Sequence, residues 1–64
     1  MKMTLKAARV NAGYTQRQVA EYLEVAESTV VNWELGKYSI SAENLSKLSY
    51  LYKIKMDDFL LPAV

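Results

Sequence analysis

Apolar residues recur at helical spacing on both sides of a short interruption within residues 15–36. Val19 and Leu23 stand four positions apart on a first helix, and Val30 and Trp33 stand three apart on a second. The segment between them has room only for the turn of about three to four residues that a helix-turn-helix unit uses. Because the second helix of such a unit can project side chains into the DNA major groove, the pattern predicts a module that reads DNA sequence.

Signals for helix ends divide the chain into five helices. Thr4 precedes an apolar helical stripe, and Gly13 follows it as a left-handed C-terminal residue. Thr15 and Gln18 form the Thr-x-x-Gln capping box that opens the next helix. The predicted helices lie at about residues 5–12, 16–23, 26–35, 42–52 and 56–60. The predicted fold class is therefore all-α, a compact five-helix domain without strands that occupies residues 1–64.

The second half of the chain carries the last two of these helices. Ser41 is placed to cap the fourth helix, and Pro62 prevents continuation of the fifth. Phe59 and Leu60 in the fifth helix are expected to turn inward. The inner face of the fourth helix is marked by Leu45, Leu48, Leu51 and Tyr52.

Composition narrows the possible functions. The chain has 64 residues, enough for one small domain, and 52% of them are apolar. It has no Cys and no His, which excludes disulfides and the usual zinc sites, and we expect no cofactor. Without an apolar run of membrane-spanning length or a signal-peptide core, the expected location is the cytoplasm. A net charge of only +1 means that any case for DNA binding depends on where the charges lie.

The chain resembles the Cro/repressor-type helix-turn-helix family, also called XRE-like, from Leu5 to Leu60. The residues that match the family motif in register are Leu5, Arg9, Gly13, Thr15, Gln16, Ala20, Leu23, Val25, Ser28, Thr29, Val30, Trp33, Glu34 and Gly36. A later segment is echoed by Leu45, Leu48, Ile54, Asp57, Phe59 and Leu60. The resemblance implies a repressor-like domain that binds double-stranded DNA, typical of transcriptional repressors of phages or mobile elements.

Two departures from the family pattern fall in the turn. Glu24 stands where the family usually has Gly, and a left-handed backbone there costs a residue with a Cβ about 1 kcal/mol or more. Ala26 stands where a capping Ser or Thr is favoured, and a missing cap costs about 1 kcal/mol. Both lower the expected stability without changing the expected fold.

The resemblance assigns roles to three residues that are not expected to contact bases. It implies that Arg9 and Glu34 meet as a partly buried ion pair, in which the planar guanidinium bonds a carboxylate twice. The alternative is two ordinary surface charges. It also implies that Gln16 touches a DNA phosphate beside the N–H donors of its helix N-terminus. The alternative for Gln16 is a side chain that caps its own helix.

The second helix of the unit carries the candidate base contacts. Its N-terminal end and the same face one turn later select Glu27, Ser28 and Asn32. Asn bridges adenine N6 and N7, Glu accepts from cytosine N4, and Ser is permissive. Val31 offers an apolar surface to a thymine methyl group. For each residue the alternative is an exposed position on a solvated helix face.

The remaining candidates are phosphate contacts. By resemblance, the loop of Lys37, Tyr38 and Ser39 would lie along the DNA backbone. Arg17 would flank the other side of the second helix of the unit, the reading helix. Thr29 is expected to face a phosphate or the preceding helix. Single Lys and Arg residues are exposed by default, so only their placement on both sides of the reading helix supports these assignments.

The sequence is also compatible with two kinds of protein partner. The apolar segment 59–64 is expected either to cover the core or to form a weak or DNA-assisted homodimer, since related operators are paired half-sites. A second hypothesis is a protein–protein adaptor or antitoxin-like module that has kept the fold and lost DNA affinity. Without His, Cys or a carboxylate cluster, an enzyme is not expected, and neither are a membrane or a small-molecule ligand.

Overall fold

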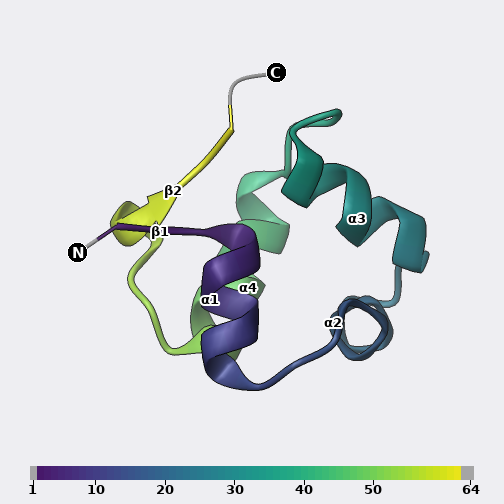
Figure 1. The fold of residues 1–64 in the computed structure, drawn as a ribbon, viewed down its shortest axis with the longest axis horizontal. Helices are drawn as coiled ribbons and strands as arrows, with labels where there is room; N and C mark the ends of the chain where they lie inside the picture. Colours follow the sequence, from purple (N-terminus) through teal and green to yellow (C-terminus); the bar gives the residue numbers. More distant parts are fainter. Residues whose placement is uncertain (1, 63–64) are drawn as a thin grey trace.

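Four α-helices make up most of residues 2–62, the part of the chain that the computed structural model describes (Figure 1). They are α1 (Leu5–Ala12), α2 (Gln16–Leu23), α3 (Glu27–Leu35) and α4 (Ala42–Tyr52). A 3-10 turn, η1 (Met56–Asp58), follows, and two short strands, β1 (Met3–Thr4) and β2 (Phe59–Leu60), lie near the chain ends. The first four predicted helices are confirmed. No helix within residues 2–62 has the length and apolar character needed to cross a membrane.

The helix ends are where the capping signals predict them. The Thr4 hydroxyl accepts from the Ala7 N–H at 3.0 Å, and the Ser41 hydroxyl accepts from the Asn44 N–H at 3.2 Å. At the start of α2 both hydrogen bonds of the Thr15–Gln18 capping box are present. Because these bonds satisfy first-turn N–H groups that have no partner inside a helix, local sequence is enough to set the starts of α1, α2 and α4.

The predicted fifth helix over residues 56–60 is wrong, and so is the prediction of a domain without strands. Only the three residues of η1 are helical, and β2 then pairs in parallel with β1. Met3 lies opposite Phe59, and Thr4 lies opposite Leu60. Successive strand side chains point to opposite sides, so Phe59 enters the core while Leu60, expected inside, is 53% exposed.

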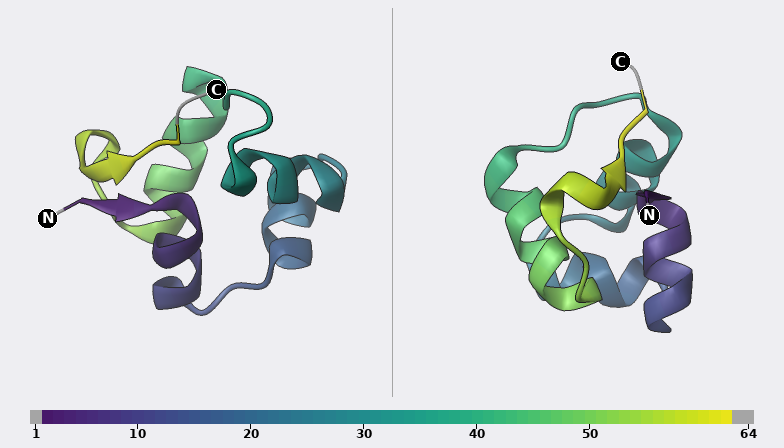
Figure 2. Two further views of the ribbon diagram at one scale, coloured as in Figure 1. Left: turned by 45° about the horizontal axis from the view of Figure 1, so that its top comes forward. Right: turned by 90° about the vertical axis from the view of Figure 1, so that its left-hand side faces the viewer.

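Helices α1 and α4 lie opposite the α2–α3 pair (Figure 2), and buried side chains from all four helices form the core. Trp33 and Tyr52 belong to it, as the helical spacing predicts, and the Tyr52 ring meets Phe59 edge-on at a centroid distance of 6.4 Å. The buried apolar residues are Leu5, Ala8, Val19, Ala20, Leu23, Val30, Trp33, Leu45, Leu48, Tyr52 and Phe59. These side chains fix α2 and α3 against the rest of the domain, which sets the direction in which the outer side of α3 faces.

The turn between α2 and α3 has the two weak points that the sequence indicates. Glu24 ends α2 in the left-handed region, with φ 58° and ψ 45°, where glycine carries no steric cost. Ala26 precedes α3 without a side-chain hydrogen bond to the helix N-terminus. A backbone hydrogen bond closes the turn at the end of α2, where the Val25 N–H donates to the Ala20 carbonyl at 3.0 Å.

Candidate nucleic-acid interface

The outward side of α3 is defined by the residues that the core buries. Val30 and Trp33 are 2% and 6% exposed and face inward. With about 3.6 residues per turn, the opposite side carries a stripe that we call the reading face. The reading face consists of Ser28, Val31, Asn32 and Leu35. Ser28 and Leu35 are exposed, and Val31 and Asn32 are half-buried, so this strip of α3 is open to a ligand.

Three of the four predicted base contacts lie on the reading face. Ser28, Val31 and Asn32 share it, whereas Glu27 is exposed in the first turn and points about a quarter turn away. Thr29 is half-buried on the other flank. Leu35, which is 64% exposed, was not predicted as a site residue. Its spacing of four residues from Val31 and seven from Ser28 was the available signal.

The N-terminus of α2 presents backbone donors. The capping box uses the N–H groups of Thr15 and Gln18. The first-turn N–H groups of Gln16 and Arg17 are left, since such groups have no partner inside their own helix. The Arg17 side chain is 78% exposed, and its Nε lies 3.7 Å from the Glu21 carboxylate in a loose pair. Exposed pairs of this kind are weak, so Arg17 is free to turn toward an anion.

Arg9 on α1 and Glu34 in the last turn of α3 are brought together by the fold. Arg9 Nε donates to Glu34 Oε2 at 2.7 Å, and Arg9 Nη2 donates to Glu34 Oε1 at 3.2 Å. Gln16 Nε2 donates to the same Oε1 at 3.0 Å, and Arg9 Nη1 donates to the Tyr14 carbonyl at 2.9 Å. We call Arg9, Gln16 and Glu34 the brace. It links α1, the first residue of α2 and the last turn of α3.

Burial makes the brace a fixed part of the fold. The side chains of Arg9 and Glu34 are only 10% and 6% exposed. The hydrogen bonds to Glu34 raise the pKa of Arg9, so its charge is permanent. Nearby, burial raises the pKa of Tyr52 above its usual range, and the Glu34 carboxylate adds to that rise. Because the Gln16 amide donates to this buried carboxylate, the brace holds the Gln16 side chain, which does not cap its own helix.

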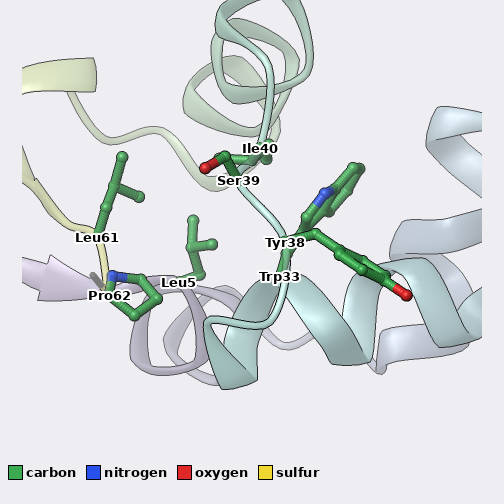
Figure 3. Close-up of a pocket in the computed structure, with 7 residues that line it drawn as sticks. All are labelled: Leu5, Trp33, Tyr38, Ser39, Ile40, Leu61 and Pro62. Carbon is green, nitrogen blue, oxygen red and sulfur yellow. The ribbon is translucent and has the colours of Figure 1, made fainter. Parts of the chain in front are cut away.

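The loop after α3 carries three exposed candidates, Lys37, Tyr38 and Ser39. It runs beside the C-terminal segment, and the two enclose an open cavity of about 220 Å³ (Figure 3). The Tyr38 ring points away from Leu61 and Pro62. The cavity is lined by Leu5, Trp33, Tyr38, Ser39, Ile40, Leu61 and Pro62.

Charge is unevenly distributed around the reading face. Glu21, Glu24 and Glu27 are all exposed near the α2–α3 turn, while Arg17 and Lys37 provide positive charge before and after α3. Asp57 and Asp58 belong to η1, on the far side of the molecule from α2 and α3 (Figure 1).

The chain is similar to known helix-turn-helix proteins. A family model described as helix-turn-helix matches residues 5–59. The HTH-type transcriptional regulator ImmR of Bacillus subtilis (strain 168) is 40% identical over 53 residues. That alignment covers 83% of this chain and 42% of ImmR, so the chain spans less than half the length of this relative. No solved structure matches the chain.

Proposed function

The chain belongs to the Cro/repressor-type helix-turn-helix family, and from this membership we propose that it is a sequence-specific regulator of transcription. Its family consists of DNA-binding regulators, and the chain is not an enzyme. In the proposal, α3 enters the major groove of double-stranded DNA with the reading face toward the bases. The observation that carries it is the exposed reading face on a helix whose other side is held by the core.

Each candidate residue takes one of two tasks in this proposal. Ser28, Val31 and Asn32 contact base edges, where hydrogen bonds and apolar contacts distinguish the base pairs. Glu27 reaches only a base at the edge of the footprint, because it lies off the reading face. The phosphate contacts, which set register rather than sequence preference, come from Gln16, Arg17, Thr29, Lys37, Tyr38 and Ser39. Gln16 would use the second N–H of its amide, since the first donates to Glu34.

Binding as a pair of chains fits this proposal. One short helix contacts few bases, and regulators of this type bind half-sites about one DNA turn apart. Leu60 and Leu61 are 53% and 45% exposed, so they offer apolar surface to a second copy of the chain. We therefore propose a homodimer, weak in solution and stabilised on DNA, acting as a repressor of the phage or mobile-element type.

The test is binding to duplex DNA over a range of salt concentrations. A regulator that contacts phosphates loses affinity steeply as salt rises, because binding releases condensed counterions. Lys37→Ala should weaken binding to every sequence and flatten the logarithmic salt dependence by about one unit. Lys47→Ala, on the exposed side of α4, is the matched control and should leave the slope unchanged. A Lys37 variant with an unchanged slope would remove this residue from the contact set.

A second candidate function is a protein–protein adaptor or antitoxin-like module of the same fold. The observation in its favour is that Glu24 and Glu27 are exposed near the α2–α3 turn and Glu21 is only loosely paired with Arg17, since carboxylates repel phosphates. Lack of any binding to duplex DNA at low salt would favour this function over the first.

A further inference from the structure

The side chains on α3 are unusual for a helix that reads DNA. From Glu27 to Leu35 the helix has no Arg, Lys or Gln. Arg and Lys are the residues that read guanine O6 and N7, and Gln shares the reading of adenine with Asn. On the reading face the only side chain with a bidentate match to a base is therefore Asn32, whose match is adenine.

The rest of the reading face is largely apolar. Leu35 is 64% exposed, and Val31, four residues earlier on the same side, is half-buried. Core contacts do not explain an exposed Leu on the side of α3 opposite Val30 and Trp33. In the major groove, the apolar feature of a base pair is the C5-methyl group of thymine.

We propose that the reading face selects A·T base pairs, with Asn32 contacting adenine and Val31 and Leu35 contacting thymine methyl groups. This inference rests on the proposed function and narrows the class of DNA sequence that the chain binds. Residues four apart on a helix are separated by about 6 Å along its axis, close to two base-pair steps of about 3.4 Å. Val31 and Leu35 therefore reach thymines on nearby base pairs.

The charges around the reading face favour recognition of bases by apolar contacts. Glu21, Glu24 and Glu27 lie near the α2–α3 turn and offset the positive charges of Arg17 and Lys37, so net charge adds little attraction to phosphates around the reading face. Burial of a methyl group against Val31 or Leu35 adds affinity without any charge. It also adds sequence preference, because adenine, guanine and cytosine have no such group.

The experiment uses the whole chain and duplexes selected for binding from a random library. In the tightest duplex, each thymine is replaced singly by deoxyuridine, which keeps base pairing and removes only the methyl group. We expect at least two positions at which this replacement weakens binding by about fourfold, the effect of one buried methyl group. The selected sequences should also be enriched in A·T pairs at these positions.

Two variants assign the methyl contacts to residues. Val31→Ala and Leu35→Ala should each abolish the uracil effect at one position while the effect at the other persists. Val10→Ala is the matched control, because Val10 is a 59% exposed apolar residue on α1, away from the reading face, and it should leave both effects intact.

The possible outcomes distinguish failure of the A·T preference from failure of DNA binding itself. Sequence-specific binding that is insensitive to uracil at every position would overturn the inference and leave the DNA-binding function standing. A uracil effect that persists fully in both variants would also overturn it, because the methyl groups would then be read by other side chains or through DNA shape. Failure to bind any duplex would overturn both, and would favour a protein partner for the apolar stripe.

Discussion

The two ends of α3 are held in different ways. At its C-terminal end, the Glu34 carboxylate accepts hydrogen bonds from Arg9 and Gln16, and Gly36 closes the helix at φ 79°. At its N-terminal end, Ala26 provides no cap, and the preceding turn contains Glu24 in a left-handed conformation. The first end combines buried charge with satisfied hydrogen bonds, whereas the second combines an open helix terminus with backbone strain.

This difference separates two tasks within one short helix. The braced end sets the direction of α3 relative to α1 and α2, because one carboxylate joins all three helices. The open end carries Ser28, the first residue of the reading face, and Val31, Asn32 and Leu35 follow it along the helix toward the braced end. Regions that contact ligands are commonly the less stable parts of a fold, and the uncapped start of α3 fits that rule.

The largest expected effect comes from breaking the braced end. Arg9→Ala leaves Glu34 as a buried carboxylate without its cationic partner, and the free energy of unfolding should fall by about 3 kcal/mol. Replacing both partners with apolar residues, Arg9→Met with Glu34→Leu, should cost much less, because no buried charge is stranded. Urea denaturation measures both variants.

The exposed Arg17–Glu21 pair is the control for this prediction. Arg17→Ala should change the free energy of unfolding by about 0.5 kcal/mol or less, since that pair is solvated and loosely spaced. If Arg9→Ala were no more costly than Arg17→Ala, the two ends of α3 would not differ in the way described.

A cap at the open end should stabilise the protein. Ala26→Ser supplies a hydroxyl to the free N–H groups of the first turn, which should raise the free energy of unfolding by about 1 kcal/mol. Ser41→Ala removes the corresponding cap from α4 and should lower it by a similar amount. Thermal denaturation compares the two, and equal melting temperatures for the wild type and Ala26→Ser would contradict the expectation.

Release of strain in the turn should have a smaller effect. Glu24→Gly relieves a left-handed conformation that costs about 1 to 2 kcal/mol but increases the entropy of the unfolded chain, so the net gain should be about 0.5 kcal/mol. Lys53→Gly is the control, because Lys53 has the same φ of 58° outside the helix-turn-helix. A gain at Lys53 alone would show that the turn relieves the strain at Glu24 in another way.

The last prediction concerns Tyr52, which lies beside the brace. Its effect on stability should be absent near neutral pH and appear only at high pH. Its raised pKa means that the unfolded chain releases this proton first, at about pH 10. Stability from the neutral phenol is therefore complete below that pH and is lost as pH rises toward the folded pKa. Tyr52→Phe should flatten the fall in melting temperature above pH 10, whereas Tyr50→Phe, at an 82% exposed position, should not. Equal slopes for the two variants would argue against the shift.

Local signals in the sequence were sufficient for most of the fold. Apolar periodicity and the caps at Thr4, Thr15 and Ser41 predicted α1, α2 and α4 because each capping bond spans three residues. The weak points at Glu24 and Ala26 were also visible, since left-handed and cap positions have strong residue preferences. The candidates Glu27, Ser28 and Asn32 follow from their position on the helix and its spacing, and Val31 from its apolar side chain; their roles on DNA are still predictions.

Tertiary structure decided the features that depend on distant parts of the chain. β1 and β2 pair across more than fifty residues, and no local pattern predicts that pairing, so segment 56–60 was expected to be helical and Leu60 to be buried. The spacing of Val30 and Trp33 indicates the inner side of α3, but the 64% exposure of Leu35 is visible only in the structure, and Leu35 therefore becomes a candidate there. Likewise, Gln16 is held by Glu34 only because folding brings the start of α2 to the end of α3. Caps and periods act over a few residues, whereas these contacts exist only once the whole chain has packed.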